Sequence, residues 1–258
     1  MALWLASSAR RPRELLTKRQ QERDITTRAF QSAITAEGPL RVLEAGCGQK
    51  WTVKVPGATL RLTGVDYDAD ALRIRKEEQQ DLDEIILGDL RTVELPAEAF
   101  DVAYCAFVLE HVEGAEAVMD RLLATVRKGG LIVVLMPDGQ SVVGWAAKNF
   151  PLKAAVFYKR HIEGFKDAGQ PGHAPYPTVY DPVVSLGGMR RYAEKHHLTI
   201  TEEYGIDYVL HNFGRFKKLA ALAMTLARIL SGNRLSSSHN NLGFVLRKPS
   251  DQPPIVPC

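Results

Sequence analysis

The sequence of 258 residues predicts an α/β fold, in which helices flank a mostly parallel sheet of seven strands. The first observation is an apolar run that begins at Arg41 and leads into a Gly-X-Gly turn at Gly46 and Gly48. The second is another apolar run, which ends at Asp66, twenty positions after Gly46. This spacing is typical of a nucleotide-binding crossover between two parallel strands. The third is the β-branched run 131–136, which reads as a fully buried strand.

The remaining elements follow from periodicity and from residues that end helices. A helix is expected over 13–36, where strong helix formers precede Gly38. A stunted helix is expected over 49–58, because Pro56 limits its length. Further helices are expected over 68–80, 115–126, 185–196 and 216–230. The expected strands are 42–45, 60–66, 84–87, 100–105, 131–136, 199–208 and 241–247.

This reading divides the chain into five parts. Prolines and aromatic residues concentrate between 138 and 185, a stretch too long for a plain connection, so a substrate cap is expected there after the fifth strand. The parts are an N-terminal helical extension (1–37), a ligand-binding core (38–137), the cap insertion (138–185), the rest of the α/β domain with an amphipathic helix (186–248), and a disordered tail (249–258).

Composition and charge are those of an ordinary globular protein, with 45% apolar residues, 24% charged residues and a net charge of +3. The charge is unevenly distributed, because seven bases and one acid follow Asp207. That bias suggests a C-terminal surface that faces an anionic partner or membrane headgroups. The three cysteines, Cys47, Cys105 and Cys258, read as free thiols, so a reducing, cytoplasmic location is expected.

The two strand ends at Gly46 and Asp66 predict a site for a nucleoside. Glycine lets the backbone approach a ligand closely, and the Asp66 carboxylate can accept hydrogen bonds from both hydroxyls of a ribose. No third glycine follows Gly48 until Gly57, so the turn lacks the pattern that binds a pyrophosphate.

Five stretches, in order, resemble the motifs of class I methyltransferases that use S-adenosylmethionine (SAM). They are 44–48, 65–72, 87–90, 100–112 and 126–137. The resemblance covers about residues 38 to 137 and implies a Rossmann-like fold, SAM as cofactor, and methyl transfer to a small molecule. The short segment 49–58 departs from the family, where a longer helix follows the glycine turn.

The resemblance also implies which residues hold the cofactor. Asp66 would bind the ribose, Asp89 would accept from the adenine amine, and the Leu90 backbone N–H would donate to a ring nitrogen. The full set is Glu44, Gly46, Gly48, Asp66, Tyr67, Asp89, Leu90 and Ala106. No carboxylates stand at metal-ligand spacing, so no metal is expected.

Transfer to a hydroxyl needs a group that takes a proton. His111, in the turn after the fourth strand, is the first candidate for this general base, and Tyr158, His161 and His173 in the cap are alternates. The expected acceptor is a hydroxyl of a sugar, lipid-linked or polyketide-like metabolite. Two alternatives stay open: carbon or nitrogen methylation of a quinone-like ring, and a SAM-binding regulatory domain without turnover.

The helix over 216–230 has a wide apolar arc edged by basic residues. It suits a peripheral membrane or lipid contact through 215–234, or a lid over an apolar acceptor. An ordinary buried helix, or one that faces a second copy in a homodimer, is the alternative. Nucleic acid is not expected as a partner, because no base-flipping motif follows the fourth strand.

Overall fold

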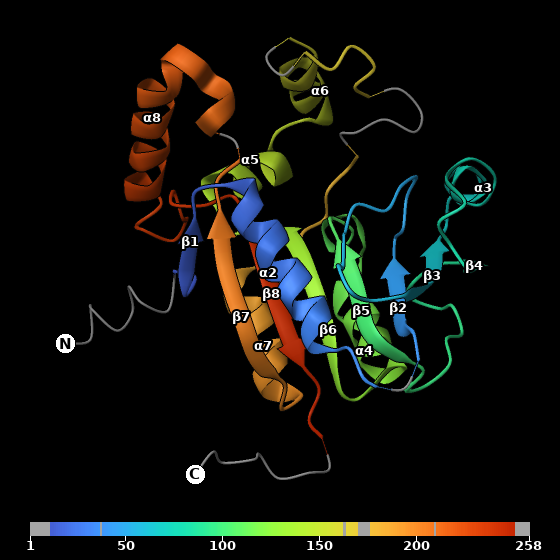
Figure 1. Ribbon diagram of the computed structural model, residues 1–258. Coiled ribbons are helices and arrows are strands. Elements are labelled where there is room, and N and C mark those ends of the chain that lie inside the picture. The colour runs from blue at the N-terminus through green and yellow to red at the C-terminus, as the bar shows by residue number, and fades with distance from the viewer. Residues whose placement is uncertain (1–10, 37, 162–163, 170–175, 209, 251–258) are drawn as a thin grey trace, which may run out of the picture.

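The computed structural model describes residues 11–36, 38–161, 164–169, 176–208 and 210–250 (Figure 1). Its centre is an eight-stranded sheet with the order β1-β7-β8-β6-β5-β2-β3-β4. Neighbouring strands run parallel, except that β8 runs antiparallel to both β6 and β7. The strands are β1 (Glu14–Leu16), β2 (Leu40–Ala45), β3 (Leu60–Asp66), β4 (Glu84–Leu87), β5 (Phe100–Ala106), β6 (Val126–Pro137), β7 (Thr199–Ile206) and β8 (Asn241–Arg247). The expected mostly parallel sheet is confirmed, with one strand more than the seven expected.

The additional strand, β1, replaces the start of the helix expected over 13–36. It pairs in parallel with the end of β7, and its Leu16 side chain is buried. Helix α2 (Arg19–Ser32) begins only afterwards, where the Gln21 side chain accepts hydrogen bonds from the backbone N–H groups of Thr17 and Lys18, each at 3.0 Å. The early helix start was wrong, because pairing with an edge strand outweighed the weak preference for helix.

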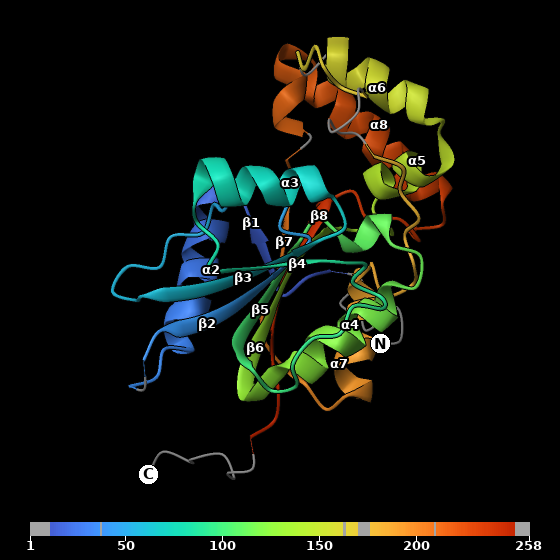
Figure 2. The ribbon, with the colours of Figure 1, turned by 90° about the vertical axis from the view of Figure 1, so that its right-hand side faces the viewer.

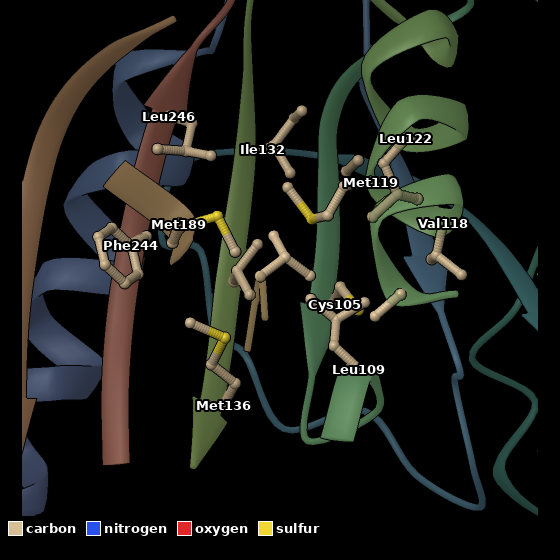
Figure 3. Close-up of a cluster of buried hydrophobic side chains, with 14 of the residues drawn as sticks. Cys105, Leu109, Val118, Met119, Leu122, Ile132, Met136, Met189, Phe244 and Leu246 are labelled. Atoms are coloured by element: carbon tan, nitrogen blue, oxygen red, sulfur yellow. The ribbon is translucent and has the colours of Figure 1, made fainter. Parts of the chain in front are cut away.

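Helices cover both faces of the sheet (Figures 1 and 2). Helix α2 buries Ile25, Ala29 and Phe30 against one face, and α4 (Ala115–Thr125) and α7 (Leu186–Lys195) cover the other. Figure 3 shows the hydrophobic core on the face that α4 and α7 cover, where their side chains meet those of β5, β6 and β8. Burial of apolar surface stabilises the fold by roughly 25 cal/mol per Å². This packing therefore holds the strands, and with them the strand ends that carry the site, in place.

The segment between β2 and β3 forms no helix, so the stunted helix expected over 49–58 was wrong. Its Trp51 ring lies 6.0 Å from the Phe30 ring and 5.5 Å from the Tyr104 ring, between centroids. The helix expected over 68–80 is divided into α3 (Ala69–Ile74) and the π-helical turn η1 (Arg75–Gln79). The connection between β2 and β3 is therefore extended and held by aromatic packing, whereas the connection between β3 and β4 is helical.

Four helical segments lie beyond the carboxyl ends of the parallel strands (Figures 1 and 2). They are α5 (Val142–Asn149), α6 (Leu152–His161), η3 (Leu210–Phe216) and α8 (Lys217–Leu230). Within α8 only Met224 is buried, so the buried alternative for this helix was wrong. Over the residues described, no helix combines the length and apolar character needed to cross a membrane.

Candidate active site

The turn after β2 needs glycine at two positions for different reasons. Gly46 and Gly48 have backbone φ angles of +68° and +53°, in the left-handed region that favours glycine. A Cβ on Gly46 would lie 2.3 Å from Val108 Cγ2, so the turn after β5 packs directly on this glycine. A Cβ on Gly48 would meet no atom of the described residues within 4 Å. The space beside Gly48 is therefore open to a ligand.

Asp66 closes β3 with a buried carboxylate that is held on both oxygens. Oδ2 accepts from the Gly48 backbone N–H at 2.8 Å, and Oδ1 accepts from the Asp68 backbone N–H at 2.9 Å. Each oxygen keeps a further lone pair, so the carboxylate can also accept from two hydroxyls of one sugar. Tyr67, the next residue, is 80% exposed and borders the same edge.

Glu44 lies under the glycine turn and is already paired. Its Oε2 lies 2.8 Å from Nη2 of the fully buried Arg75, which also contacts Asp81 Oδ1 and the Cys47 carbonyl oxygen, each at 2.7 Å. Burial lowers the pKa of Arg75, but the hydrogen bonds to Glu44 and Asp81 outweigh it and raise that pKa. Arg75 therefore stays charged and fixes the turn from below. Arg75 was not predicted as a site residue, because in the sequence it lies among other charged residues and nothing there marks it as buried.

The strand ends β4 and β5 supply the rest of the expected cofactor set. The Asp89 carboxylate accepts from Arg91 Nη2 at 2.6 Å, and these hydrogen bonds lower the pKa of Asp89 to about 2. It is therefore an ionised acceptor at neutral pH. Leu90 is buried beside it, and Ala106 is half-buried at the end of β5. Gly46, Asp66 and Ala106 thus end three adjacent strands of one edge.

The turn after β5 contains the one-turn helix η2 (Leu109–His111) and is tied to the cap. His111 Nδ1 lies 2.7 Å from the Pro177 carbonyl oxygen, so Nδ1 carries the proton and Nε2 keeps its lone pair in the neutral ring. Burial lowers the pKa of His111, which favours that neutral form. The His111 ring meets the Tyr176 ring edge-on at 5.8 Å.

Tyr176 brings the cap close to the end of β3. Burial raises its pKa, and the nearby charges of Tyr67, Asp68 and Asp66 add to that effect. Through Tyr176, His111 is therefore on the side of the edge that carries Asp66.

Of the three alternate bases, the structure describes the side chain of His161. His161 is exposed on α6, where its ring lies 4.5 Å from the Phe157 ring, and no contact among the described residues joins it to His111 or Asp66. Tyr158 is also on α6. His173 lies outside the described residues. Across the described part of the chain, no three His, Cys, Asp or Glu side chains are grouped as metal ligands.

A pocket of about 800 Å³ opens between α2, the carboxyl ends of β5 and β6, and the amino end of the antiparallel β8. Phe107, in the turn after β5, and Tyr208 are both among the residues that line it. Its lining includes Arg19, Glu22, Tyr104, Phe107, Leu135 and Tyr208. His111 is not among the residues that line it.

Glu22 is the half-buried acid among the residues that line this pocket, and it was not among the site residues predicted from the sequence. The Tyr208 hydroxyl donates to Glu22 Oε2, and the Arg19 guanidinium lies 4.5 Å from the centre of the Tyr208 ring. Burial raises the pKa of Glu22 to about 7, against the opposing charges of Arg19 and Arg23. A signal was available, because Glu22 shares the helical face of the buried Ile25 and Thr26.

Comparison with known proteins agrees with this geometry. Residues 43–134 match a family model described as a methyltransferase domain. The chain is 32% identical over 105 residues to trans-aconitate 2-methyltransferase of Paracidovorax citrulli (strain AAC00-1), covering 38% of this chain and 39% of that protein. It is 27% identical over 100 residues to phosphatidylethanolamine N-methyltransferase of Cereibacter sphaeroides, covering 37% and 49%. The chain thus spans less than half the length of these two relatives.

Solved structures show the same fold. The N-methyltransferase NodS from Bradyrhizobium japonicum WM9, in complex with S-adenosyl-L-homocysteine, has a TM-score of 0.52 at 16% identity, over 90% of this chain and 87% of that one. The [4+2]-cyclase SpnF has a TM-score of 0.55 at 13% identity, over 88% and 81%. The family whose model residues 43–134 match, and the solved structures that share the fold, are class I SAM-dependent methyltransferases, and SAM is the cofactor that this domain indicates. The open space at Gly48 and the two Asp66 oxygens are compatible with that cofactor.

Proposed function

We propose that this protein transfers the methyl group of SAM to a small molecule bound in the pocket beside α2. The observation that supports this proposal most directly is the position of the turn after β5, which contacts both the glycine turn and the pocket. Val108 packs on Gly46 of the glycine turn, and Phe107, one residue earlier, lines the pocket. A cofactor at the Gly46–Asp66 edge and an acceptor in the pocket would therefore be held on either side of one turn.

Besides the two glycines, five of the residues predicted from the sequence would contact the cofactor in this proposal. Asp66 would bind the ribose hydroxyls, Asp89 the adenine amine, and Leu90 a ring nitrogen, with Tyr67 and Ala106 bordering the site. Glu44 would act indirectly, because Arg75 already occupies its carboxylate and holds the turn. SAM supplies a methyl group on a positively charged sulfur, which leaves with its electron pair as the new bond to the acceptor forms.

The chain's own task is to hold the acceptor and to take its proton. Glu22 suits this task in the pocket, because a carboxyl with a pKa of about 7 is partly ionised at neutral pH and can accept a proton there. Tyr208 orients that carboxylate through its hydroxyl. His111 remains the second candidate, because the neutral ring keeps a lone pair on Nε2, which lies 3.7 Å from Glu110 Oε1.

The acceptor that we propose is a hydroxyl of a sugar, lipid-linked or polyketide-like metabolite. Polar side chains such as Arg19, Thr26 and Lys54 line the pocket and can bind oxygen substituents. A lipid-linked acceptor is favoured by the exposed apolar helix α8, for which a lipid contact through 215–234 is proposed, and by the similarity to a phosphatidylethanolamine N-methyltransferase. We place the enzyme in the cytoplasm, in keeping with its free, buried thiols Cys47 and Cys105.

Two alternatives rest on specific observations. A demethylmenaquinone methyltransferase of Oceanobacillus iheyensis is 27% identical over 130 residues, covering 46% of this chain and 51% of that protein. This similarity supports the first alternative, in which the acceptor is a quinone-like ring. The cyclase with the same fold shows that the fold alone does not establish methyl transfer, so a SAM-binding domain without turnover is the other.

The test is transfer of tritium from methyl-labelled SAM to a metabolite and lipid extract. Wild-type protein should label a product, and Glu22→Gln should slow labelling by about 10²-fold or more if Glu22 is the base. His111→Ala should do so instead if His111 is the base. Glu194→Gln, an exposed acid on α7, is the matched control and should match wild type. SAM bound by calorimetry but no product in any extract would favour the non-catalytic alternative.

A further inference from the structure

The elements beyond the strand ends form one surface, which we call the cap surface. It consists of the described residues 142–161 and 164–169, with α5 and α6, and residues 210–234, with η3 and α8. The two parts are held together at their borders, where the Val142 backbone N–H donates to the Ser236 carbonyl oxygen at 2.8 Å and where Ser141 and Ser236 form a β-bridge. Figures 1 and 2 both show these helices together at the end of the molecule that carries the site.

Helix α8 presents its apolar side outward. A helix of a globular protein normally buries that side. Here residues at helical spacing along one face of α8 are half or more exposed: Leu219 (64%), Leu222 (55%), Leu226 (50%), Ile229 (53%) and Leu230 (87%). Nothing in the described chain covers this face.

Exposed aromatic rings extend the apolar area across the other helices of the cap surface. These rings are on α5, on α6 and the turn after it, and at the start of α8: Trp145 (46%), Phe150 (59%), Phe157 (62%), Phe165 (59%) and Phe216 (54%). Aromatic side chains are enriched where a protein meets the interface of a bilayer. The exposed apolar patch therefore extends beyond α8, the one helix for which the sequence suggested a lipid contact.

The excess of basic residues on the cap surface favours an anionic partner. Residues 142–169 carry five bases and residues 210–234 carry another five, against two acids in the same ranges, Glu163 and Asp167. The ten bases are Lys148, Lys153, Lys159, Arg160, Lys166, Arg215, Lys217, Lys218, Arg228 and Arg234. A second copy docked through the same patch would oppose these bases to themselves, because a two-fold contact pairs like with like. An anionic lipid surface would instead attract every one of them.

We propose that the cap surface docks on an anionic lipid bilayer. Helix α8 would lie in the plane of the interface, because 14 residues are too few to span the hydrocarbon core. The apolar face of α8 and the aromatic rings would enter the acyl boundary, and the bases would meet the headgroups. The docking does not depend on methyl transfer. The consequence that the acceptor is itself borne by the membrane rests on the proposed function, since Tyr208, which lines the pocket, lies just before η3.

Vesicle sedimentation tests the docking. The probe is a set of vesicles of 70:30 phosphatidylcholine and phosphatidylglycerol, with pure phosphatidylcholine vesicles beside it. Wild-type protein should pellet with the anionic vesicles and lose most of its binding between 50 and 500 mM salt, because surface charge is screened. Lys217→Glu with Lys218→Glu should lower the partition coefficient by at least about tenfold, since each base near the surface counts for about a fivefold change.

Two further variants separate charge from apolar contact. Leu222→Gln with Leu226→Gln should also lower binding, at any salt concentration, with an unchanged circular dichroism spectrum. Arg191→Glu with Lys195→Glu makes the same change of charge on α7, away from the cap surface in Figure 1, and should bind like wild type. Brominated lipids should quench the fluorescence of Trp145, and the quenching should disappear in Trp145→Phe.

Three results would overturn the proposal: no pelleting with anionic vesicles at 50 mM salt, an equal loss in the α7 control, or a concentration-dependent dimer that Leu222→Gln with Leu226→Gln dissociates while no vesicle binding is seen. The last would assign the surface to a second copy. Calorimetry with SAM keeps the two proposals apart, because loss of vesicle binding with intact SAM binding rejects only the docking. Intact docking without SAM binding would reject only the enzyme.

Discussion

Gly46 and Gly48 share a left-handed backbone but differ in their surroundings. Replacing either by alanine puts a Cβ where L-residues are strained, at about 1–2 kcal/mol. At Gly46 the new Cβ would also collide with Val108, whereas at Gly48 it would enter open space. We therefore expect Gly46→Ala to destabilise the fold clearly more than Gly48→Ala in urea unfolding.

The same pair separates packing from ligand access. Gly48→Ala should chiefly weaken SAM binding, because its Cβ points into the space proposed for the cofactor. Gly46→Ala with Val108→Ala should recover part of the lost stability. Equal losses for the two single variants would show that Val108 does not constrain the turn.

Glu110 gives the molecule a pH-dependent stability. Its side chain is buried, its Oε2 has no hydrogen-bond partner among the described residues, and burial raises its pKa from 4.5 to about 7. The folded state therefore holds this proton more tightly than the unfolded state. The resulting stabilisation is complete below pH 4.5 and is lost as the pH rises through 7.

Unfolding in urea at pH 5 and pH 8 measures this effect. The wild-type free energy of unfolding should fall by about 2–3 kcal/mol more over that range than that of Glu110→Gln, which cannot ionise. Parallel pH curves for the two proteins would show that Glu110 does not carry a raised pKa.

At the scale of single residues, the sequence predicted groups whose role follows from strand-end position. Asp66, Gly46 and Gly48 lie at such ends, and the structure joins Asp66 to Gly48 directly. Glu22 and Arg75 could not be placed in this way, because their partners, Tyr208 and Glu44, are 186 and 31 residues away. Contacts of that kind are decided by tertiary packing.

At the scale of elements, helix α4 is capped by a distant segment. Its N-cap residue, Gly114, has no side chain to offer, and the Asp181 Oδ2 accepts from the backbone N–H groups of Gly114 and Ala115 at 2.7 and 2.9 Å. The negative charge also suits the positive end of the helix. Asp181 thereby ties the segment before α7 to the start of α4.

Asp181→Ala should lower the free energy of unfolding by about 1–2 kcal/mol, the usual effect of a lost N-cap. Asp181→Asn keeps one oxygen acceptor and should lose less. Urea unfolding of the three proteins measures this, and unchanged stability in the alanine variant would mean that water replaces the cap without loss.

Elements with strong periodicity were predictable, whereas weak ones were not. The runs that form β3, β4 and β8 were predicted with the observed boundaries, although β4 is largely exposed. The extended segment 49–58 was taken for a helix, because the packing of Trp51 on Phe30 and Tyr104 is invisible in a single sequence. Strand β1 was missed for the same reason, since only its pairing with β7 makes it a strand.

At the scale of the whole molecule, three features converge on one end of the sheet. Gly46, Asp66 and Ala106 lie at the edge proposed to hold the cofactor, the pocket that Phe107 lines is proposed to hold the acceptor, and the cap surface lies beyond the strand ends. A parallel sheet brings these features together because its strands all end on the same side. Methyl transfer at a lipid interface would use all three at once.

The most direct measurement is calorimetric titration of the full chain with SAM. We predict one SAM per chain, with affinity weakened by about 1–3 kcal/mol in Asp66→Ala, the scale of a lost hydrogen bond to a charged group. Asp70→Ala, which removes a nearby exposed carboxylate, should bind like wild type. A wild-type chain that takes up no SAM, or an Asp66→Ala chain that binds it with undiminished affinity, would contradict the account.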